Sequence, residues 1–364
     1  MTVYNGETYL RKTISCILNQ TFKNFEFLIV DDCSKDNTKK IIKSFNDDRI
    51  RLLSNNLNIG QTKSLNKGLK EAKGEYIARM DSDDISFPNW LEKSINFLDE
   101  NSDYHAVGCS ALVIDENNII YDTLNRPTDF SGVIFNIFFG TSILHVGSLI
   151  NKVSLEGVGG YTEDIKIVQD FDLWSKFIKS GFKIISISDI LVAVRVYPNS
   201  LGGLNESTIG VSEMSQIICE NVKSFTKLNL SFNDAKKMRL FYRFPEKLNE
   251  EEFAYTNNLY LEVFGNIKNE LFINKVALSK MIKNKMLIPY LKRAIYFSSI
   301  GNVKRARKII YLYLKNYGFH IQPLILIIFS FISPSIITNI MVLKNRFLKI
   351  ILKLYYFSYK IKRV

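Results

Sequence analysis

Residues 25–32 read FEFLIVDD, a short apolar run that ends in two carboxylates. A run of this kind indicates a strand that is buried on both faces of a parallel sheet. Amphipathic helical patterns flank it at residues 7–19 and 34–45. Because strand and helix patterns alternate, we expect an α/β fold with a mostly parallel sheet flanked by helices. The alternation continues with strands at 50–53 and 76–80 and helices at 60–72 and from Pro88 onward.

Acidic residues follow two of these predicted strands. Asp31 and Asp32 end the first run, and Asp81, Asp83 and Asp84 follow the last one. Ligands of open α/β sheets bind at the carboxyl ends of the strands. Carboxylates grouped this closely repel one another unless a cation or a set of donors compensates their charge. Oxygen ligands of this type suit Mg²⁺ or Mn²⁺. The alternative is a solvated turn in which one of the aspartates caps the next helix.

Charge is distributed unevenly along the 364 residues. All 36 Asp and Glu lie in residues 1–270, whereas residues 271–364 hold 18 of the 48 Lys and Arg and no acidic residue. The first part is therefore mildly acidic, which argues against a nucleic-acid-binding surface on it. The four Cys residues form no CxxC pair, and their spacing favours a reducing compartment over a disulfide scaffold or a zinc ribbon.

Sequence patterns and composition divide the chain into three parts, which are an α/β domain at 1–205, a helical region at 206–320 and a basic, apolar tail at 321–364. Residues 105–114 and 119–123 predict a β-hairpin inside the first part. Residues 289–316 predict a two-helix hairpin, inside the second part, that turns at Gly301.

The tail combines an uncharged stretch with a basic one. Residues 323–343 carry no charge and are long enough to span a bilayer. Cations alternate with aromatic and aliphatic residues from 344 to 363, which is typical of a helix lying on anionic lipid. We expect peripheral attachment to the inner face of the cell membrane, with the rest of the protein in the cytoplasm. A packed helical domain and a true membrane span are the alternatives.

Six motifs occur in order over the first half of the chain: TVYNGE from Thr2, ILNQTF from Ile17, FEFLIVDDCSKDNT from Phe25, NNLNIGQTKSLNKGL from Asn55, KGEYIARMDSDD from Lys73 and VGGYTEDIKIVQDFDLW from Val158. Together they resemble the family 2 glycosyltransferases of the bacterial cell-surface polysaccharide type, whose catalytic domain has the GT-A fold. The resemblance implies an inverting, divalent-metal-dependent enzyme. Such an enzyme moves a sugar from a nucleoside diphosphate sugar, with a UDP sugar favoured here, to a hydroxyl of a glycan or lipid-linked acceptor.

The resemblance also implies which residues bind the donor. Tyr4 would stack on a uracil, and Asp32 would accept a hydrogen bond from the imide N–H of the base. Asp81 and Asp83 would bind ribose hydroxyls or the metal, and Asp83 and Asp84 would bind Mg²⁺ or Mn²⁺. The sequence leaves the division of roles among these three aspartates open. The other implied donor-binding residues are Thr2, Glu7, Lys63 and Arg195.

The resemblance places the general base at Asp170, where a helix is predicted to start. This carboxylate would take the proton of the acceptor hydroxyl during attack; the alternative role is that of an N-cap. His145 and Trp174 would lie on the acceptor side, although a His in an apolar stretch is more often structural. Tyr197 stands where the family usually has a His near the metal or diphosphate. The sequence therefore leaves the residues of that part of the leaving-group site unassigned.

Other functional classes lack their signatures. A sugar nucleotidyltransferase would need a glycine-rich phosphate loop after the first strand, and NGET at residues 5–8 is not one. An NAD-dependent oxidoreductase would need GxGxxG. A non-catalytic nucleotide-sugar-binding partner subunit is the remaining alternative. The first strand is short because the chain opens with MTVYN, and family members generally have several apolar residues before this point, so we expect the native protein to begin upstream.

Overall fold

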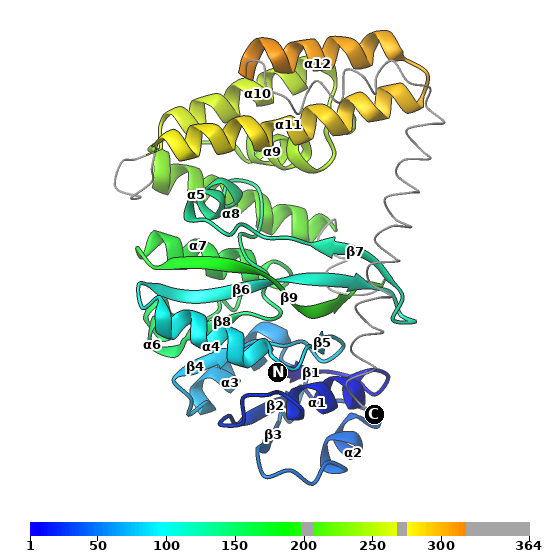
Figure 1. Cartoon of the computed structure of the whole chain (residues 1–364), viewed down its shortest axis with the longest axis vertical. Helices are drawn as coiled ribbons and strands as arrows, with labels where there is room; N and C mark the ends of the chain where they lie inside the picture. The colour runs from blue at the N-terminus through cyan, green and yellow to red at the C-terminus, as the bar shows by residue number, and fades with distance from the viewer. Residues whose placement is uncertain (198–206, 268–274, 318–364) are drawn as a thin grey trace. The chain divides into compact units, whose positions relative to one another are not determined.

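The structure is a computed structural model that describes residues 1–197, 207–267 and 275–317. The tail at 321–364, for which we predict membrane attachment, lies outside these residues. The chain divides into two compact units, Met1–Ile217 and Ile218–Val364. The division falls inside one helix, α8 (Thr208–Thr226), which is labelled in Figure 1.

The first unit contains two β-sheets. Three parallel strands form the first sheet, in the order β1-β2-β3. The second sheet has the order β4-β8-β6-β9-β5, with β7 also paired to β6. Its β6 and β9 are parallel, and its other pairs are antiparallel. The strands are β1 (Thr2–Val3), β2 (Phe27–Asp31), β3 (Ile50–Ser54), β4 (Tyr76–Ala78), β5 (Ile85–Ser86), β6 (Tyr104–Ile114), β7 (Ile120–Leu124), β8 (Leu149–Asn151) and β9 (Lys183–Arg195).

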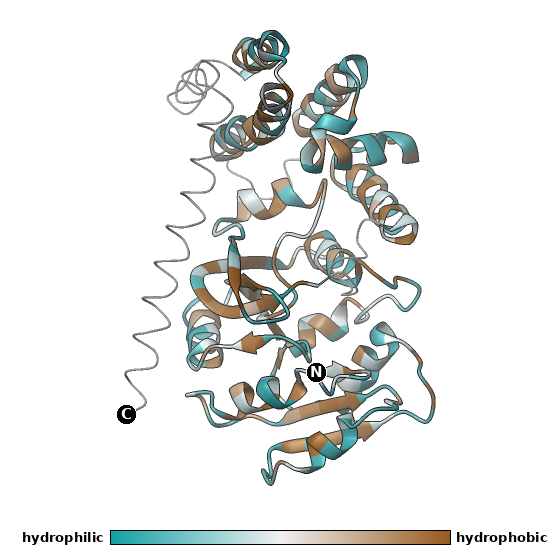
Figure 2. Cartoon of the chain, turned by 90° about the vertical axis from the view of Figure 1, so that its right-hand side faces the viewer, coloured by the Kyte–Doolittle hydropathy of each residue, from teal (hydrophilic) through white to brown (hydrophobic). Residues whose placement is uncertain are grey.

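Helices alternate with these strands, which confirms the predicted α/β class. In the view coloured by hydropathy, strands are largely hydrophobic while helices carry hydrophobic and hydrophilic residues side by side (Figure 2). The predicted hairpin is confirmed as the antiparallel pair of β6 and β7. The helices of the first unit are α1 (Leu10–Leu18), α2 (Thr38–Lys43), α3 (Gln61–Glu71), α4 (Trp90–Glu100), α5 (Phe130–Asn136), α6 (Lys152–Gly157) and α7 (Gln169–Lys179), followed by α8.

Helix α2 is shorter than the prediction of 34–45. Carboxylates hold the residues before it in turns, since Asp31 accepts from the Ser34 backbone N–H and Asp36 accepts from the Thr38 backbone N–H. Cys33 also has a positive φ of 66°. Side-chain hydrogen bonds of Asp to nearby backbone N–H groups compete with helix formation, so the helix starts only at Thr38.

Helix α1 packs on the parallel sheet through one face. Leu10, Ile14 and Ile17 recur at helical spacing and are at most 4% exposed. They belong to one buried cluster with Phe27 and Ile29 of β2. This core fixes the positions of the loops that leave β1 and β2.

A mostly apolar cavity of about 760 Å³ lies between the two sheets. Residues of β1, β2 and β4 contribute to its wall, together with residues of α3 and α4. Trp90 of α4 lines it and is 1% exposed, with its indole N–H donating to the Gly147 carbonyl at 2.8 Å. The cavity reaches Arg79 and Tyr161, which also belong to the site described below.

The second unit is helical in its described part, and the helical region predicted there is present. Its elements are the C-terminal part of α8, α9 (Phe232–Arg243), a 3₁₀ turn η2 (Pro245–Lys247), α10 (Glu250–Gly265), α11 (Lys275–Ser299) and α12 (Val303–Tyr317). The hairpin of α11 and α12 turns at Gly301, as predicted, with φ of 79°. However, α11 begins well before residue 289 and continues through Pro289. No helix in the described residues combines the length and apolar character that crossing a membrane requires.

Candidate active site

The loop after β4 presents the acidic cluster. Arg79, which is 2% exposed, donates from Nη2 to Asp81 Oδ1 at 2.5 Å and from Nη1 to the Met80 carbonyl at 2.5 Å. Its own backbone is held by Gly147 and Ser148 through hydrogen bonds of 2.8 Å. A buried guanidinium therefore fixes the first carboxylate of the cluster and balances its charge.

Asp83 is the partly exposed second carboxylate. Its Oδ2 accepts a hydrogen bond from the Tyr197 hydroxyl at 3.0 Å. Burial, and after it the negative charge of Asp81, raises the pKa of Asp83. Two carboxylates therefore lie close enough to repel each other. Tyr197, which stands where we expected the family's His, contacts Asp83 of this pair through its hydroxyl.

Asp84 is 2% exposed and forms its hydrogen bonds inside the protein. Its Oδ1 accepts the backbone N–H of Arg195 at 2.7 Å, and its carbonyl accepts the Thr13 hydroxyl at 2.8 Å. Burial, with the charges of Asp83 and Asp81, raises its pKa well above the usual range. Asp84 thus connects the acidic loop to α1 and to the end of β9, and this burial leaves Asp83 as the more accessible member of the predicted metal-binding pair.

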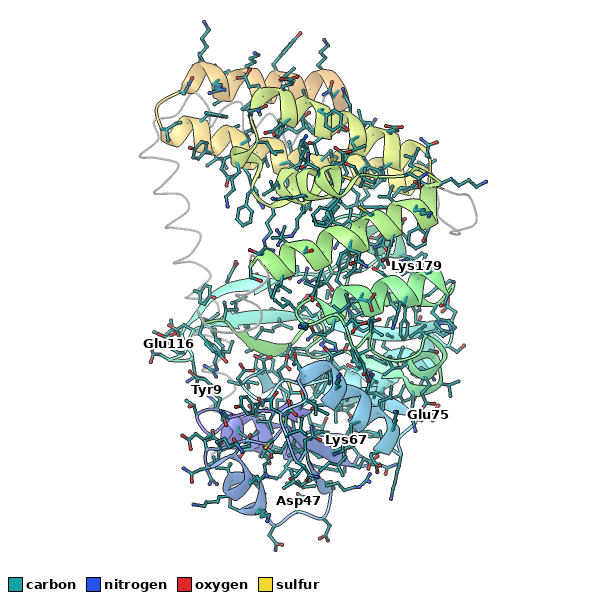
Figure 3. All side chains as sticks on the ribbon, turned by 180° about the vertical axis from the view of Figure 1, so that it is seen from behind. Tyr9, Asp47, Lys67, Glu75, Glu116 and Lys179 are labelled. Carbon is teal, nitrogen blue, oxygen red and sulfur yellow. The ribbon has the colours of Figure 1, made fainter. Side chains whose placement is uncertain are left out.

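Arg195 is 4% exposed and has partners on three sides. Its Nε donates to the Asp83 carbonyl at 2.9 Å, and Nη1 donates to the Asp115 carbonyl at 2.7 Å. The guanidinium carbon lies 4.1 Å from the centre of the Tyr9 ring. Figure 3 labels Tyr9 and Glu116, which flank this buried arginine. Arg195 therefore holds the acidic loop against the β6–β7 turn.

The described residues include no group of three His, Cys, Asp or Glu side chains arranged to hold a metal ion by themselves. The donor set nevertheless fits Mg²⁺ or Mn²⁺. Asp81 and Asp83 supply oxygen atoms, and the raised pKa of Asp83 reflects, after burial, a like charge nearby. Magnesium is usually held by one or two carboxylates and completed by water and substrate phosphates.

Asp32 organises the loop that follows β3. It is 3% exposed, and its Oδ1 accepts the Asn55 side-chain amide at 2.8 Å and the Ile59 backbone N–H at 2.9 Å. Its Oδ2 accepts the Gly60 backbone N–H at 2.9 Å, where φ is 89°. An ionised carboxylate offers about four acceptor positions. Three are filled here, so Asp32 shapes the loop and retains limited capacity for a ligand.

We predict that Asp32→Ala destabilises the protein by about 1–3 kcal/mol, because it leaves partly buried backbone N–H groups without an acceptor. Asp32→Asn keeps one acceptor oxygen and should cost less. Denaturant unfolding of the two variants measures this difference. Equal stability of Asp32→Ala and the wild-type protein would show that the loop does not depend on this carboxylate.

Four other predicted donor residues lie in β1, in the loop that follows β1, and on α3. Thr2 is buried in β1, whereas Tyr4, just after it, is 50% exposed. Glu7 Oε2 accepts the backbone N–H of Asn37 at 2.9 Å and so ties the first loop to the start of α2. Lys63 is exposed on the first turn of α3. The exposed Tyr4 ring is available for stacking, and Glu7 has a structural contact.

Asp170 lies in the first turn of α7 and is partly buried. Burial raises the pKa of its carboxyl, and this is opposed by the Phe171 backbone N–H, the charge of Arg126 and the Thr141 side chain. Its neighbour Asp172 accepts the Thr162 hydroxyl at 2.5 Å and lies 3.8 Å from Lys176 Nζ. Asp172 is therefore held by a hydroxyl and an ammonium group, whereas Asp170 is a carboxyl whose pKa burial raises.

Tyr161 and His145 form a buried pair, and the charges of Asp81 and Asp170 both act on Tyr161. His145 Nε2 lies 2.8 Å from the Tyr161 hydroxyl, and burial with the nearby charge of Arg79 lowers the pKa of His145 well below its usual value. Burial raises the pKa of Tyr161, and Asp81 and Asp170 contribute to this rise while Arg79 opposes it. His145 is thus a neutral interior residue.

Trp174 is also an interior residue. It is fully buried on α7, and its ring packs edge-on against His145, with centroids 6.4 Å apart, and against Phe177. Neither His145 nor Trp174 is exposed enough to meet an acceptor directly. Both support the region around Tyr161 from within the core.

Three residues that support the candidate site were not predicted from the sequence. Gln61 and Gln169 join Asp81 to the first turn of α7 by hydrogen bonds. Glu213 of α8 accepts the backbone N–H groups of residues 166–168 at 2.8 to 3.3 Å, immediately before that turn. Two of these residues, Gln61 and Gln169, do stand inside quoted motifs, but an amide next to a predicted helix start carries no functional signal of its own.

Comparisons with known proteins agree with this geometry. The sequence model for "Glycosyl transferase family 2" matches residues 1–155. The chain is 34% identical over 200 residues to "Putative glycosyltransferase EpsE" of Bacillus subtilis (strain 168), covering 54% of this chain and 71% of that protein. It is 28% identical over 201 residues to "Putative teichuronic acid biosynthesis glycosyltransferase TuaG" of the same organism, covering 54% of this chain and 78% of that protein.

Among solved structures, the chain is similar to S. aureus TarS 1-349 in complex with UDP-GlcNAc. The TM-score is 0.53 at 17% sequence identity, and the match covers 86% of this chain and 90% of that one. This likeness concerns the fold, and it confirms the predicted GT-A class. With the sequence matches, it identifies the protein as a glycosyltransferase. The chain belongs to glycosyl transferase family 2.

Proposed function

We propose that the protein is an inverting, divalent-metal-dependent glycosyltransferase that moves a sugar from a nucleoside diphosphate sugar to a hydroxyl of a glycan or lipid-linked acceptor in cell-surface polysaccharide synthesis. The observation that carries this proposal is the pair Asp81 and Asp83, connected through side chains to the turn that bears Asp170. The end of the site with Asp81 and Asp83 suits a divalent metal ion bound to the donor diphosphate. The end with Asp170 suits abstraction of the acceptor proton. The name of one relative, a putative teichuronic acid biosynthesis glycosyltransferase, supports the polysaccharide setting.

The acceptor hydroxyl would lose its proton to the Asp170 carboxylate while its oxygen attacks the anomeric carbon. The bond from that carbon to the diphosphate oxygen breaks, and its electron pair leaves with the nucleoside diphosphate. Attack from the face opposite the leaving group inverts the anomeric configuration. The raised pKa of Asp170 supports this role, because a base is most effective when its pKa lies near the working pH.

Residues of the first sheet would bind the nucleotide. The exposed Tyr4 ring would stack on the base, and Asp32 would offer its remaining acceptor capacity to the imide N–H of a uracil. Lys63, exposed on α3, would approach the diphosphate. Thr2 and Glu7 would contribute to nucleotide binding indirectly, by holding the loop that follows β1.

Asp81 and Asp83 would hold Mg²⁺ or Mn²⁺ together with the donor diphosphate. A bound divalent ion stabilises the negative charge that develops on the departing diphosphate. Asp84 and Arg195 would keep the acidic loop in place from the interior. Tyr197 would orient the Asp83 carboxylate through its hydroxyl hydrogen bond.

Release of nucleoside diphosphate from a panel of donor sugars, with and without Mn²⁺, tests the proposed function. We expect one or a few donors to be turned over, and turnover to stop when EDTA is added. The anomeric configuration of the product, determined by NMR, tests inversion. Binding of every donor without turnover, even with a range of glycan acceptors, would favour a non-catalytic binding subunit instead.

We also propose that residues 321–364 bind an anionic membrane surface. The support is the charge of this segment, since seven cations occur between Lys344 and Arg363 without an acidic residue. Each cation near an anionic surface contributes about 1 kcal/mol of attraction. We predict that replacing these cations by Gln releases the full chain from phosphatidylserine vesicles. Phosphatidylcholine vesicles serve as the control, and binding that is insensitive to salt would contradict the electrostatic contribution.

A further inference from the structure

Two glutamine side chains form a bridge between the donor side and the base side of the site. Gln61 is the first residue of α3, and Gln169 is the first residue of α7. The Gln169 Nε2 group donates to Gln61 Oε1 at 2.7 Å, and the Gln61 Nε2 group donates to Asp81 Oδ1 at 3.3 Å. The residue after Gln169 is Asp170. The bridge therefore runs from the first carboxylate of the acidic loop to the turn that carries the base.

The Gln61 end of the bridge is held by the loop between β3 and α3. Asp32 accepts the backbone N–H groups of Ile59 and Gly60, and Gly60 is the residue that caps α3. The position of Gln61 is thus tied to the carboxylate that we propose faces the base of the nucleotide. Asp81 is fixed independently by Arg79.

The Gln169 end of the bridge is buried and incompletely satisfied. Gln169 is 6% exposed, and within the described part of the chain its Oε1 atom has no hydrogen-bond partner. Its Nε2 bond to Gln61 is therefore the polar contact that offsets the burial of this amide. A buried polar group that loses its partner is costly, so this contact strongly restricts where α7 can begin relative to α3.

An amide is the side chain that this position requires. Gln61 accepts one hydrogen bond and donates another, which only a carboxamide of this length does here. Glutamate at residue 61 could accept from Gln169 but would place a second carboxylate against Asp81. Leucine would have a similar volume and would make neither hydrogen bond.

We propose that Gln61 is a positioning residue that keeps Asp170 in register with Asp81, and so couples the bound donor to the base. This inference rests on the proposed function of the same site. It assigns Gln61 and Gln169 a role in the alignment of acceptor and donor. Neither residue takes or gives a proton.

Steady-state kinetics of Gln61→Leu give the first test, with donor affinity measured separately by calorimetry. We expect kcat for transfer to fall by about 10- to 100-fold, since small misplacements of a catalytic group have effects of this size. Donor affinity should change by less than about threefold, because Arg79 still fixes Asp81. Gln61→Glu should be worse than Gln61→Leu. Lys70→Leu, at an exposed position near the other end of α3, is the control and should behave like the wild-type enzyme.

A double-mutant cycle with Gln169→Leu gives the second test. If the two amides act through one bridge, the double variant should be no slower than the slower single variant, and its melting temperature should show the same non-additivity. Additive losses in kcat and in melting temperature would overturn the bridge. Wild-type kcat in Gln61→Leu, or a loss confined to donor affinity, would overturn the coupling.

The outcome for the wild-type enzyme separates this inference from the proposed function. Absence of turnover with every donor and acceptor would overturn the proposed function, and the coupling with it. An active wild-type enzyme whose kcat is unchanged in Gln61→Leu would leave the proposed function intact and reject the coupling alone.

Discussion

Asp170→Asn should lower the rate of sugar transfer by about 10²- to 10⁴-fold, the usual contribution of a positioned general base. The substitution removes the carboxylate that we propose takes the acceptor proton, and it changes little else. The amide oxygen of Asn can still accept the Phe171 backbone N–H, which lies 2.8 Å from Asp170 Oδ1. Donor binding, measured by calorimetry, should therefore be retained.

Asp172→Asn is the matched control, because it lies on the same turn of α7. Its carboxylate accepts the Thr162 hydroxyl and faces the Lys176 ammonium. We expect this variant to lower the melting temperature and to leave kcat within a few fold of the wild-type value. If Asp170→Asn abolished donor binding as well, or if Asp172→Asn were the slower enzyme, the base would have to be assigned elsewhere.

The pH dependence of transfer provides a further check on Asp170. Burial raises the pKa of this carboxyl above its ordinary value, which is about 3.9 for Asp. The base acts only when deprotonated, so activity should rise with pH as Asp170 loses its proton. The acid limb of the kcat profile should therefore lie above the ordinary Asp range and disappear in the residual activity of Asp170→Asn.

Local patterns predicted the elements of the first unit well, because apolar runs and helical periodicity are properties of neighbouring residues. Strand β2 and helix α3 begin within two residues of their predicted starts. Pairing between distant strands is not a local property, which is why the antiparallel pairing of β8 with β4 and β6, and of β5 with β9, was not predicted. The hydrogen bond from Arg195 of β9 to Asp84 joins residues that are 111 positions apart, and no pattern of residue spacing predicts it.

The same distinction explains the site. Motif positions led us to predict functional roles for Asp81, Asp83 and Asp170, because their residue types and places along the chain carry a chemical meaning. Burial could not be predicted for Asp84, Arg195 or Trp174, since it depends on partners that arrive from other elements. A bridging role such as that of Gln61 depends on a partner 108 residues away. Sequence therefore indicated the chemical groups, and only the structure distinguished the exposed groups from the supporting ones.

Asp83→Asn and Asp84→Ala should separate metal binding from structural support within one acidic loop. Asp83 is partly exposed and lies beside a second carboxylate, so its loss should abolish Mn²⁺-stimulated donor turnover. Its hydrogen bond with Tyr197 can persist, because the Asn oxygen can still accept from the hydroxyl. The melting temperature of Asp83→Asn should therefore stay close to that of the wild-type protein.

Asp84→Ala should act mainly on stability. The substitution leaves the buried backbone N–H of Arg195 without its acceptor, which costs about 1–3 kcal/mol. Calorimetric titration with Mn²⁺ in the presence of a nucleoside diphosphate, at a temperature where both variants are folded, measures the metal contribution directly. Weak Mn²⁺ binding in Asp83→Asn, with near-normal binding in Asp84→Ala, is the expected result. The reverse pattern would assign the metal to Asp84, and would mean that its carboxylate turns outward when the donor binds.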